Sequence, residues 1–145
     1  MIRLLYFDLS LFSLDANKVY FYVHKTVDKA MGNPLPFEIA KTNVGNAMDI
    51  KTGVFTAPVD GNYFFTFSCV SNKGGTLRVQ LMHNGAAVGT AVAKEPLNTA
   101  AMQSLLTLVK GDKISLSTKD SDEDSEGIRE KSNRRQTHFT GMLLF

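Results

Sequence analysis

Residues 51–67 read KTGVFTAPVDGNYFFTF, and this stretch predicts a strand, a turn and a second strand. Pro58 ends the first strand, because proline has no N–H to donate to a neighbouring strand. Asp60-Gly61 supplies a residue that tolerates positive φ in a hairpin turn. In the second strand, period-two counting puts four residues on one face: Tyr63, Phe65, Phe67 and Cys69. We therefore expect a hairpin whose second strand lines a hydrophobic core.

Outward from this stretch, the chain reads as short strands separated by turns at near-regular spacing. Further strands are expected at residues 18–24, 37–43, 77–82, 86–93, 103–109, 113–118 and 138–145. His83-Asn84-Gly85 is a strong hairpin signal, and Ser115 and Ser117 are expected to face outward. Nowhere do apolar residues recur at the 3.6-residue spacing of an amphipathic helix over as many as three turns. The pattern predicts an all-β protein, built as an antiparallel two-sheet sandwich or barrel.

Length and composition are those of one ordinary globular domain. The chain has 145 residues, of which 43% are hydrophobic and 21% charged. A formal charge of +2 without a long basic run argues against nucleic-acid binding. No apolar run approaches the roughly 18 residues of a membrane span, so no membrane insertion is expected. Cys69 is the single cysteine and falls on a core face, which indicates a buried, inert thiol.

Several strands carry large apolar residues on both faces. The second faces hold seven of them, namely Tyr20, Tyr22, Phe64, Val70, Leu105, Met142 and Leu144. If these strands share one sheet, its outer surface is an apolar patch of the kind that marks an interface. The alternatives are a scatter of surface hydrophobic residues, or cover from residues 1–17. We expect the sheet to pack against copies of itself.

Several of these segments, in order along the chain, resemble the globular head domain of complement C1q and its relatives. They are NVGNAMD at 43–49, TGVFTAPVDGNYFFTF at 52–67, LMHNG at 81–85, SLLTL at 104–108 with Gly111-Asp112, and FTGMLLF at 139–145. The resemblance covers residues 19–145 and implies a jelly roll of about ten strands, like that of tumour necrosis factor. It also implies a homotrimer, packed through the sheet that contains the first and last strands. No Gly-X-Y collagen repeat precedes these segments, so a head-only member or a fragment is expected, with residues 18–145 as the head domain.

Residues 1–17 are a separate N-terminal segment. A basic residue followed by an apolar stretch is typical of a secretion signal, but Asp8 interrupts that stretch and Leu14-Asp15-Ala16 is a poor cleavage site. An extra strand, or a start codon upstream of the true one, are the alternatives. Taken with the resemblance, the expected location is extracellular.

The chain carries no pattern typical of a catalytic site. It has no Gly-x-Ser-x-Gly elbow, no phosphate-binding Gly-x-x-x-x-Gly-Lys-Ser/Thr, no His-Glu-x-x-His and no paired cysteines. Its histidines, His24, His83 and His138, lack local metal-ligand spacing, although His24 and His138 lie on end strands that can be neighbours. We expect no enzyme.

Residues 119–136 form a charged loop with an acidic and then a basic half. Asp120, Asp122 and Asp124 place carboxylates at alternate positions, as calcium prefers, but Ser125 stands where an EF-hand needs glycine. A looser calcium site is therefore the candidate, and a solvated loop is the alternative. The candidate ligand-binding residues are the basic ones that follow, Arg129, Lys131, Arg134 and Arg135. They would face polyanions or pair with the acidic half across a long hairpin.

These expectations together describe a non-catalytic, trimeric recognition module of the lectin-like, innate-immune type. Its ligands would be extracellular glycans, lipopolysaccharide or another polyanion, or proteins. A cytokine-like trimeric ligand of a cell-surface receptor and a structural trimerisation cap are the alternatives. Calcium is the one cofactor for which the sequence offers a candidate site.

Overall fold

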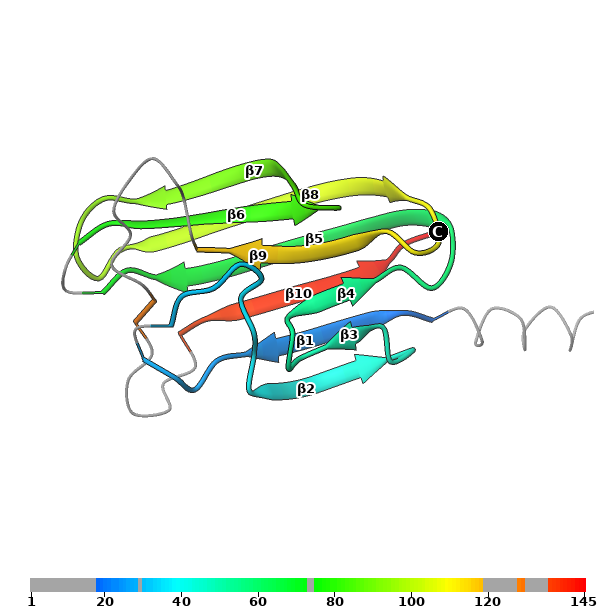
Figure 1. Cartoon of the computed structure of the whole chain (residues 1–145), viewed down its shortest axis with the longest axis horizontal. Coiled ribbons are helices and arrows are strands. Elements are labelled where there is room, and N and C mark those ends of the chain that lie inside the picture. Colours follow the sequence, from blue (N-terminus) through cyan, green and yellow to red (C-terminus); the bar gives the residue numbers. More distant parts are fainter. Residues whose placement is uncertain (1–17, 29, 73–74, 119–127, 130–135) are drawn as a thin grey trace, which may run out of the picture.

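The protein is a sandwich of two five-stranded antiparallel sheets (Figure 1). The computed structural model describes residues 18–28, 30–72, 75–118, 128–129 and 136–145. Sheet one consists, in spatial order, of β2 (Ile39–Val44), β1 (Tyr20–His24), β10 (His138–Leu143), β5 (Gly61–Val70) and β8 (Thr99–Leu108). Sheet two consists of β3 (Met48–Asp49), β4 (Val54–Thr56), β9 (Lys113–Ser117), β6 (Leu77–His83) and β7 (Ala86–Ala93). The expected all-β jelly roll of about ten strands is confirmed.

Aromatic rings from both sheets fill the space between them. The Phe21 ring lies 5.0 Å from that of Phe139 and 5.4 Å from that of Phe55, centroid to centroid. Phe65 lies 5.5 Å from Phe55 in an edge-on arrangement, which suits the ring quadrupoles. The expected core face of β5 is confirmed, because all four of its residues are 3% exposed or less, namely Tyr63, Phe65, Phe67 and Cys69.

The hairpin expected at residues 51–67 is wrong, although both of its strands exist. β4 pairs with β3 and β9 in sheet two, whereas β5 pairs with β10 and β8 in sheet one. The connection therefore crosses from one sheet to the other. Neither Asp60 nor Gly61 has a positive φ. Gly61 is instead a site of close approach, since a Cβ there would lie 2.6 Å from Leu143 Cδ1 and 3.1 Å from the Phe145 carbonyl oxygen.

Two further expectations need correction. Ser115 and Ser117 share the outer face of sheet two with half-exposed residues of β6, but they are only 9% and 1% exposed and so are not solvated. Both are short side chains in a central strand, and their register partners on β6 are the longer Met82 and Gln80. β8 begins at Thr99 rather than at residue 103, because its small first residues pair with the end of β5.

The turns at one end of the sandwich are tied together by Asp112. Asn84 and Gly85 have φ values of 50° and 84°, which confirms the hairpin expected between β6 and β7. The Asp112 carboxylate, in the β8–β9 turn, accepts hydrogen bonds from Asn84 Nδ2 at 3.0 Å and the Val109 N–H at 3.0 Å, and lies 3.1 Å from His83 Nε2. These bonds, the one from Asn84 first, lower the pKa of Asp112 to about 2.

We expect Asp112→Asn to destabilise the protein in a pH-dependent way. A carboxylate whose folded pKa lies below its unfolded value of about 3.9 stabilises the fold above that value and loses the contribution as the pH falls towards 2. The melting temperature of the variant should lie below that of the wild type at pH 6, and the gap should close between pH 4 and pH 2. Thermal denaturation followed by circular dichroism at stepwise pH measures this. A gap that stays constant down to pH 2 would contradict it.

Candidate functional site

The outer face of sheet one, away from the core, carries a row of apolar side chains that crosses all five strands. In register order this apolar row is Val44 (β2), Tyr20 (β1), Met142 (β10), Phe64 (β5) and Leu105 (β8). Leu105 is 69% exposed, Tyr20 41% and Met142 36%. Because register partners share a face, the row is contiguous and not a scatter.

The seven residues expected at a subunit interface divide into a cluster and two outliers. Tyr20, Phe64, Leu105 and Met142 lie in the apolar row, and Leu144, 45% exposed, continues from Met142 at the same end. Tyr22 is one row further along, opposite Thr140 and Thr42.

Val70 is the second outlier, at the other end of β5. It pairs with Thr99, six residues and about 20 Å along the strand from Phe64. Val44, in contrast, was missed by the sequence reasoning because it precedes a Gly-Asn turn. Only its register opposite Tyr20 reveals it.

A ring cluster occupies the same face beyond the apolar row. His24 and His138 are register partners on β1 and β10, which confirms that the two histidine-bearing end strands are neighbours. Tyr22 Oη lies 2.6 Å from His138 Nδ1, within hydrogen-bond distance. The outer face thus changes along the strands from apolar to polar and titratable.

A buried ion pair holds the β1–β2 connection on the flank of this face. Lys25 is 1% exposed, and its Nζ lies 3.0 Å from Glu38 Oε2 and 2.6 Å from the Pro36 carbonyl oxygen. Glu38 Oε1 also accepts the Thr26 N–H at 2.7 Å. These hydrogen bonds join Lys25 and Thr26, which follow β1, to Pro36 and Glu38, which precede β2, and so hold the connection in place.

Of the four candidate ligand-binding residues, Arg129 alone lies within the described residues. It is partly exposed, and its N–H donates to the Val70 carbonyl at 2.8 Å, which fixes it beside the end of β5. The other three, Lys131, Arg134 and Arg135, lie outside the described residues. The calcium candidates Asp120, Asp122 and Asp124 lie outside them as well.

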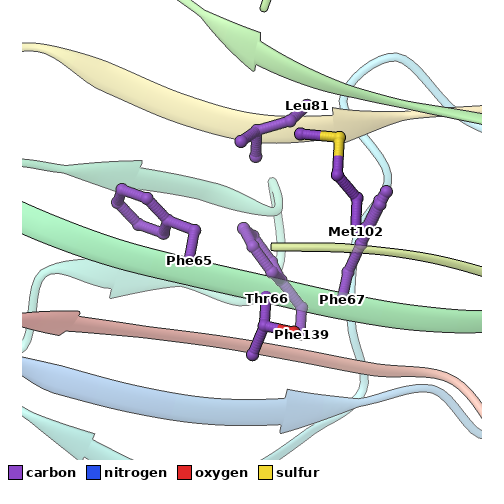
Figure 2. A pocket seen from close by; sticks show the side chains of 6 residues that line it. All are labelled: Phe65, Thr66, Phe67, Leu81, Met102 and Phe139. Carbon is purple, nitrogen blue, oxygen red and sulfur yellow. The ribbon is translucent and has the colours of Figure 1, made fainter. Parts of the chain in front are cut away.

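A small gap lies among side chains of both sheets, with an empty volume of about 140 Å³. Figure 2 shows the side chains that line it, namely Phe65, Thr66, Phe67, Leu81, Met102 and Phe139. It is too narrow for a water molecule, so it is a packing gap. Among the described residues, no three His, Cys, Asp or Glu side chains gather as a metal site would require. Nor do those residues form any helix long and apolar enough to cross a membrane.

Cys69 lies in the core, as expected, with no exposed surface. Burial raises the pKa of its thiol to about 12, and the opposing charge of Lys25 offsets only part of that rise. Since the thiolate is the reactive form, native protein should not react with Ellman's reagent at pH 8. Protein unfolded in denaturant should release one equivalent of chromophore. Rapid labelling of the native protein would contradict the burial.

Comparison with known proteins finds similarity to proteins that contain a C1q domain. A model of the C1q domain family matches residues 20–144. Complement C1q tumor necrosis factor-related protein 3, in Homo sapiens and in Mus musculus, is 36% identical over 113 residues, which are 75% of this chain and 44% of the relative. Caprin-2 of Danio rerio is 28% identical over 135 residues, 88% of this chain and 14% of that protein. The chain thus spans less than half the length of these curated relatives.

Solved structures with the same fold include a complement domain and murine APRIL. The globular domain of zebrafish complement 1qA protein superposes with a TM-score of 0.72 at 23% identity, covering 88% of this chain and 98% of that one. Murine APRIL at pH 5.0 superposes with a TM-score of 0.67 at 10% identity, covering 88% and 99%. At these identities the two likenesses concern the fold alone.

Proposed function

Because this chain belongs to the C1q domain family, we propose that it acts as a non-catalytic homotrimeric recognition module outside the cell, binding glycans, lipopolysaccharide or protein on target surfaces. Domains of the C1q and tumour necrosis factor type typically form trimers, and C1q-domain proteins are generally recognition or signalling modules rather than enzymes. The observation that carries the proposal is the apolar row across the outer face of sheet one. In a single protomer this row would leave large apolar side chains in water.

Assembly through this face removes that apolar surface from water. The row crosses every strand of sheet one, so packing it on sister subunits buries side chains from five strands at once. Met142 and Phe64 lie near its middle, and Leu105 and Val44 lie at its two edges. An exposed apolar patch that is contiguous across a sheet is typical of a subunit interface.

Trimerisation also supplies the affinity that a single surface site lacks. Three weak sites on one rigid body bind a repetitive surface with higher apparent affinity, because the later contacts are intramolecular. The candidate residues for this contact are the basic ones, Arg129, Lys131, Arg134 and Arg135. Their charge suits polyanionic glycans and lipopolysaccharide, and such binding weakens with salt.

The test measures mass and binding together. Light scattering should give about three times the chain mass of 16.0 kDa, with and without a chelator if calcium is dispensable. Immobilised heparin and lipopolysaccharide should then bind the protein in low salt and release it in high salt. The variant Lys131→Glu/Arg134→Glu/Arg135→Glu should bind weakly. Its matched control is Lys51→Glu/Lys94→Glu/Lys110→Glu, which makes the same charge change at three exposed lysines elsewhere and should still bind.

A cytokine-like ligand of a cell-surface receptor is the second candidate. It is favoured by the 36% identity to C1q tumor necrosis factor-related protein 3 and by the fold shared with APRIL. In that case labelled trimer should bind cells saturably, and protease treatment of the cells should abolish the binding. Salt-sensitive, protease-resistant binding would favour the glycan module instead. Constant co-purification with a collagen-like chain would point to a trimerisation cap.

A further inference from the structure

The turn between β6 and β7 consists of two exposed residues, Asn84 and Gly85. No other asparagine of the chain is followed by glycine. Glycine has no side chain to shield its backbone nitrogen, and nothing lies within 4 Å of a Cβ built on Gly85. In such a pair the backbone nitrogen of the glycine can attack the side-chain amide of the asparagine before it.

The Asn84 side chain is bound to the turn between β8 and β9. Its Oδ1 accepts the Lys113 N–H at 2.8 Å, and its Nδ2 donates to Asp112 Oδ1 at 3.0 Å. The Asn84 backbone N–H also donates to the Lys113 carbonyl at 2.9 Å. Together these three bonds form a clasp between the two turns. Since both polar atoms of the amide are held, its carbon can turn towards the Gly85 nitrogen only after the clasp opens.

The turn that carries Asp112 is itself fixed to the rest of the fold. The Asp112 carboxylate accepts the Val109 N–H at 3.0 Å, and the Asp112 carbonyl accepts the Ala57 N–H at 2.9 Å. The Gly111 N–H donates in turn to the Ala57 carbonyl at 2.8 Å. This turn therefore cannot follow the Asn84 side chain when it moves, and the clasp has to break.

We propose that Asn84-Gly85 is a site of deamidation that the clasp protects, so that Asn84 reacts only when the end turns of the sandwich open. The Gly85 backbone nitrogen loses its proton to solvent and forms a bond to Cγ of Asn84. The bond between Cγ and Nδ2 breaks, and Nδ2 takes up a proton and leaves as ammonia. Water then opens the cyclic imide and leaves aspartate or isoaspartate at position 84. Water is the one co-reactant, and nothing is oxidised or reduced.

The product cannot rebuild the clasp. A carboxylate at position 84 has no N–H to donate, and it would meet the Asp112 carboxylate where a hydrogen bond of 3.0 Å stood before. Two like charges so close repel each other. Isoaspartate also adds one atom to the backbone of a two-residue turn, which disturbs the pairing of His83 with Ala86. Deamidation would thus leave a permanent record that the turns had opened. It takes place within one protomer and does not depend on the trimer proposed above.

The first experiment compares the native and the unfolded full chain. Peptide mapping by mass spectrometry follows the conversion of residue 84 during incubation at pH 8. In the native wild type it should be at least about tenfold slower than in guanidinium chloride, because opening breaks a hydrogen bond to a charged group. Asn46 is the internal reference, since it is also exposed and has a φ of 56° but precedes Ala47. In the unfolded chain it should react more slowly than Asn84.

Removal of the clasp should remove the protection. We expect Asp112→Ala to raise the native rate of deamidation at least about tenfold, with the β-sheet signal in circular dichroism retained. Asp60→Ala is the matched control, because Asp60 Oδ1 accepts the Lys110 N–H of the same turn at 2.7 Å but does not hold Asn84. It should deamidate like the wild type. If Asp112→Ala loses its β-sheet signal, the comparison of native and unfolded wild type decides.

Several outcomes would overturn the proposal. Equal rates in native and unfolded wild type would show that the clasp protects nothing, as would a folded Asp112→Ala that reacts no faster than Asp60→Ala. An unfolded chain in which Asn84 reacts no faster than Asn46 would show that this is not a deamidation site. For the consequence, Asn84→Asp should lower the melting temperature more than Asn46→Asp, which adds the same charge at another exposed residue. An equal loss would contradict the repulsion from Asp112.

Discussion

Met142→Asp should convert the proposed trimer into folded monomers. Met142 lies on β10, the central strand of sheet one, in the middle of the apolar row. A carboxylate there would be desolvated without a partner, which costs several kcal/mol per subunit, and three copies would also repel one another. We expect the apparent dissociation constant to rise by at least about 1,000-fold, since each 1.4 kcal/mol is tenfold. Light scattering over a concentration series measures it.

Two further variants make this result interpretable. Leu105→Asp changes the most exposed member of the row on the edge strand β8, so it should also dissociate the trimer with little effect on the protomer fold. Val92→Asp places the same charge on β7 of sheet two, at a side chain that is 37% exposed, and should leave the trimer intact. If Met142→Asp and Leu105→Asp remain trimers, the outer face of sheet one is not the interface.

Gly53→Ala should be among the most destabilising single substitutions in the chain. Gly53 has a φ of +78°, and a Cβ built on it would overlap the carbonyl oxygen of Leu35. The left-handed conformation costs about 1–2 kcal/mol for a residue with a Cβ, and the overlap with backbone adds about 1–3 kcal/mol. The segment that would have to move is held, because the Leu35 N–H donates to the Leu116 carbonyl at 2.8 Å.

Gly85 supplies the matched control for this prediction. Its φ of +84° is similar, but nothing lies within 4 Å of a Cβ built there. Gly85→Ala should therefore lose only the conformational part, about 1–2 kcal/mol. Urea denaturation at one fixed protein concentration compares the two, because the stability of an oligomer depends on concentration. If both variants lose the same free energy of unfolding, the contact between the new Cβ and Leu35 costs nothing, which would contradict the prediction.

The core of this protein could be predicted from its sequence because the signal is local. Alternation along β5 requires only that successive side chains point to opposite faces, and it placed Tyr63, Phe65, Phe67 and Cys69 correctly in the interior. The Asn84-Gly85 turn could be predicted equally well, because a backbone with positive φ favours asparagine and glycine whatever surrounds them.

The pairing of strands was harder to predict. The same alternation suits a hairpin and a crossover between sheets, so nothing local indicated that β4 and β5 belong to different sheets. The first residues of β8, Ala100 and Ala101, have weak β-propensity and are strand residues because Cys69 and Ser68 pair with them. Ser115 and Ser117 are buried by longer neighbours that no period reveals.

For the candidate site, the sequence by itself determined which side chains leave the core on each strand, including Tyr20, Phe64 and Met142. Only the tertiary structure decided that these form one row, that Val44 joins it, that Val70 stands apart, and that His24 meets His138. The physical reason is that a strand's own periodicity fixes the face of each residue. Its neighbours across the sheet depend on register, which arises from contacts between segments more than 100 residues apart, as between β1 and β10.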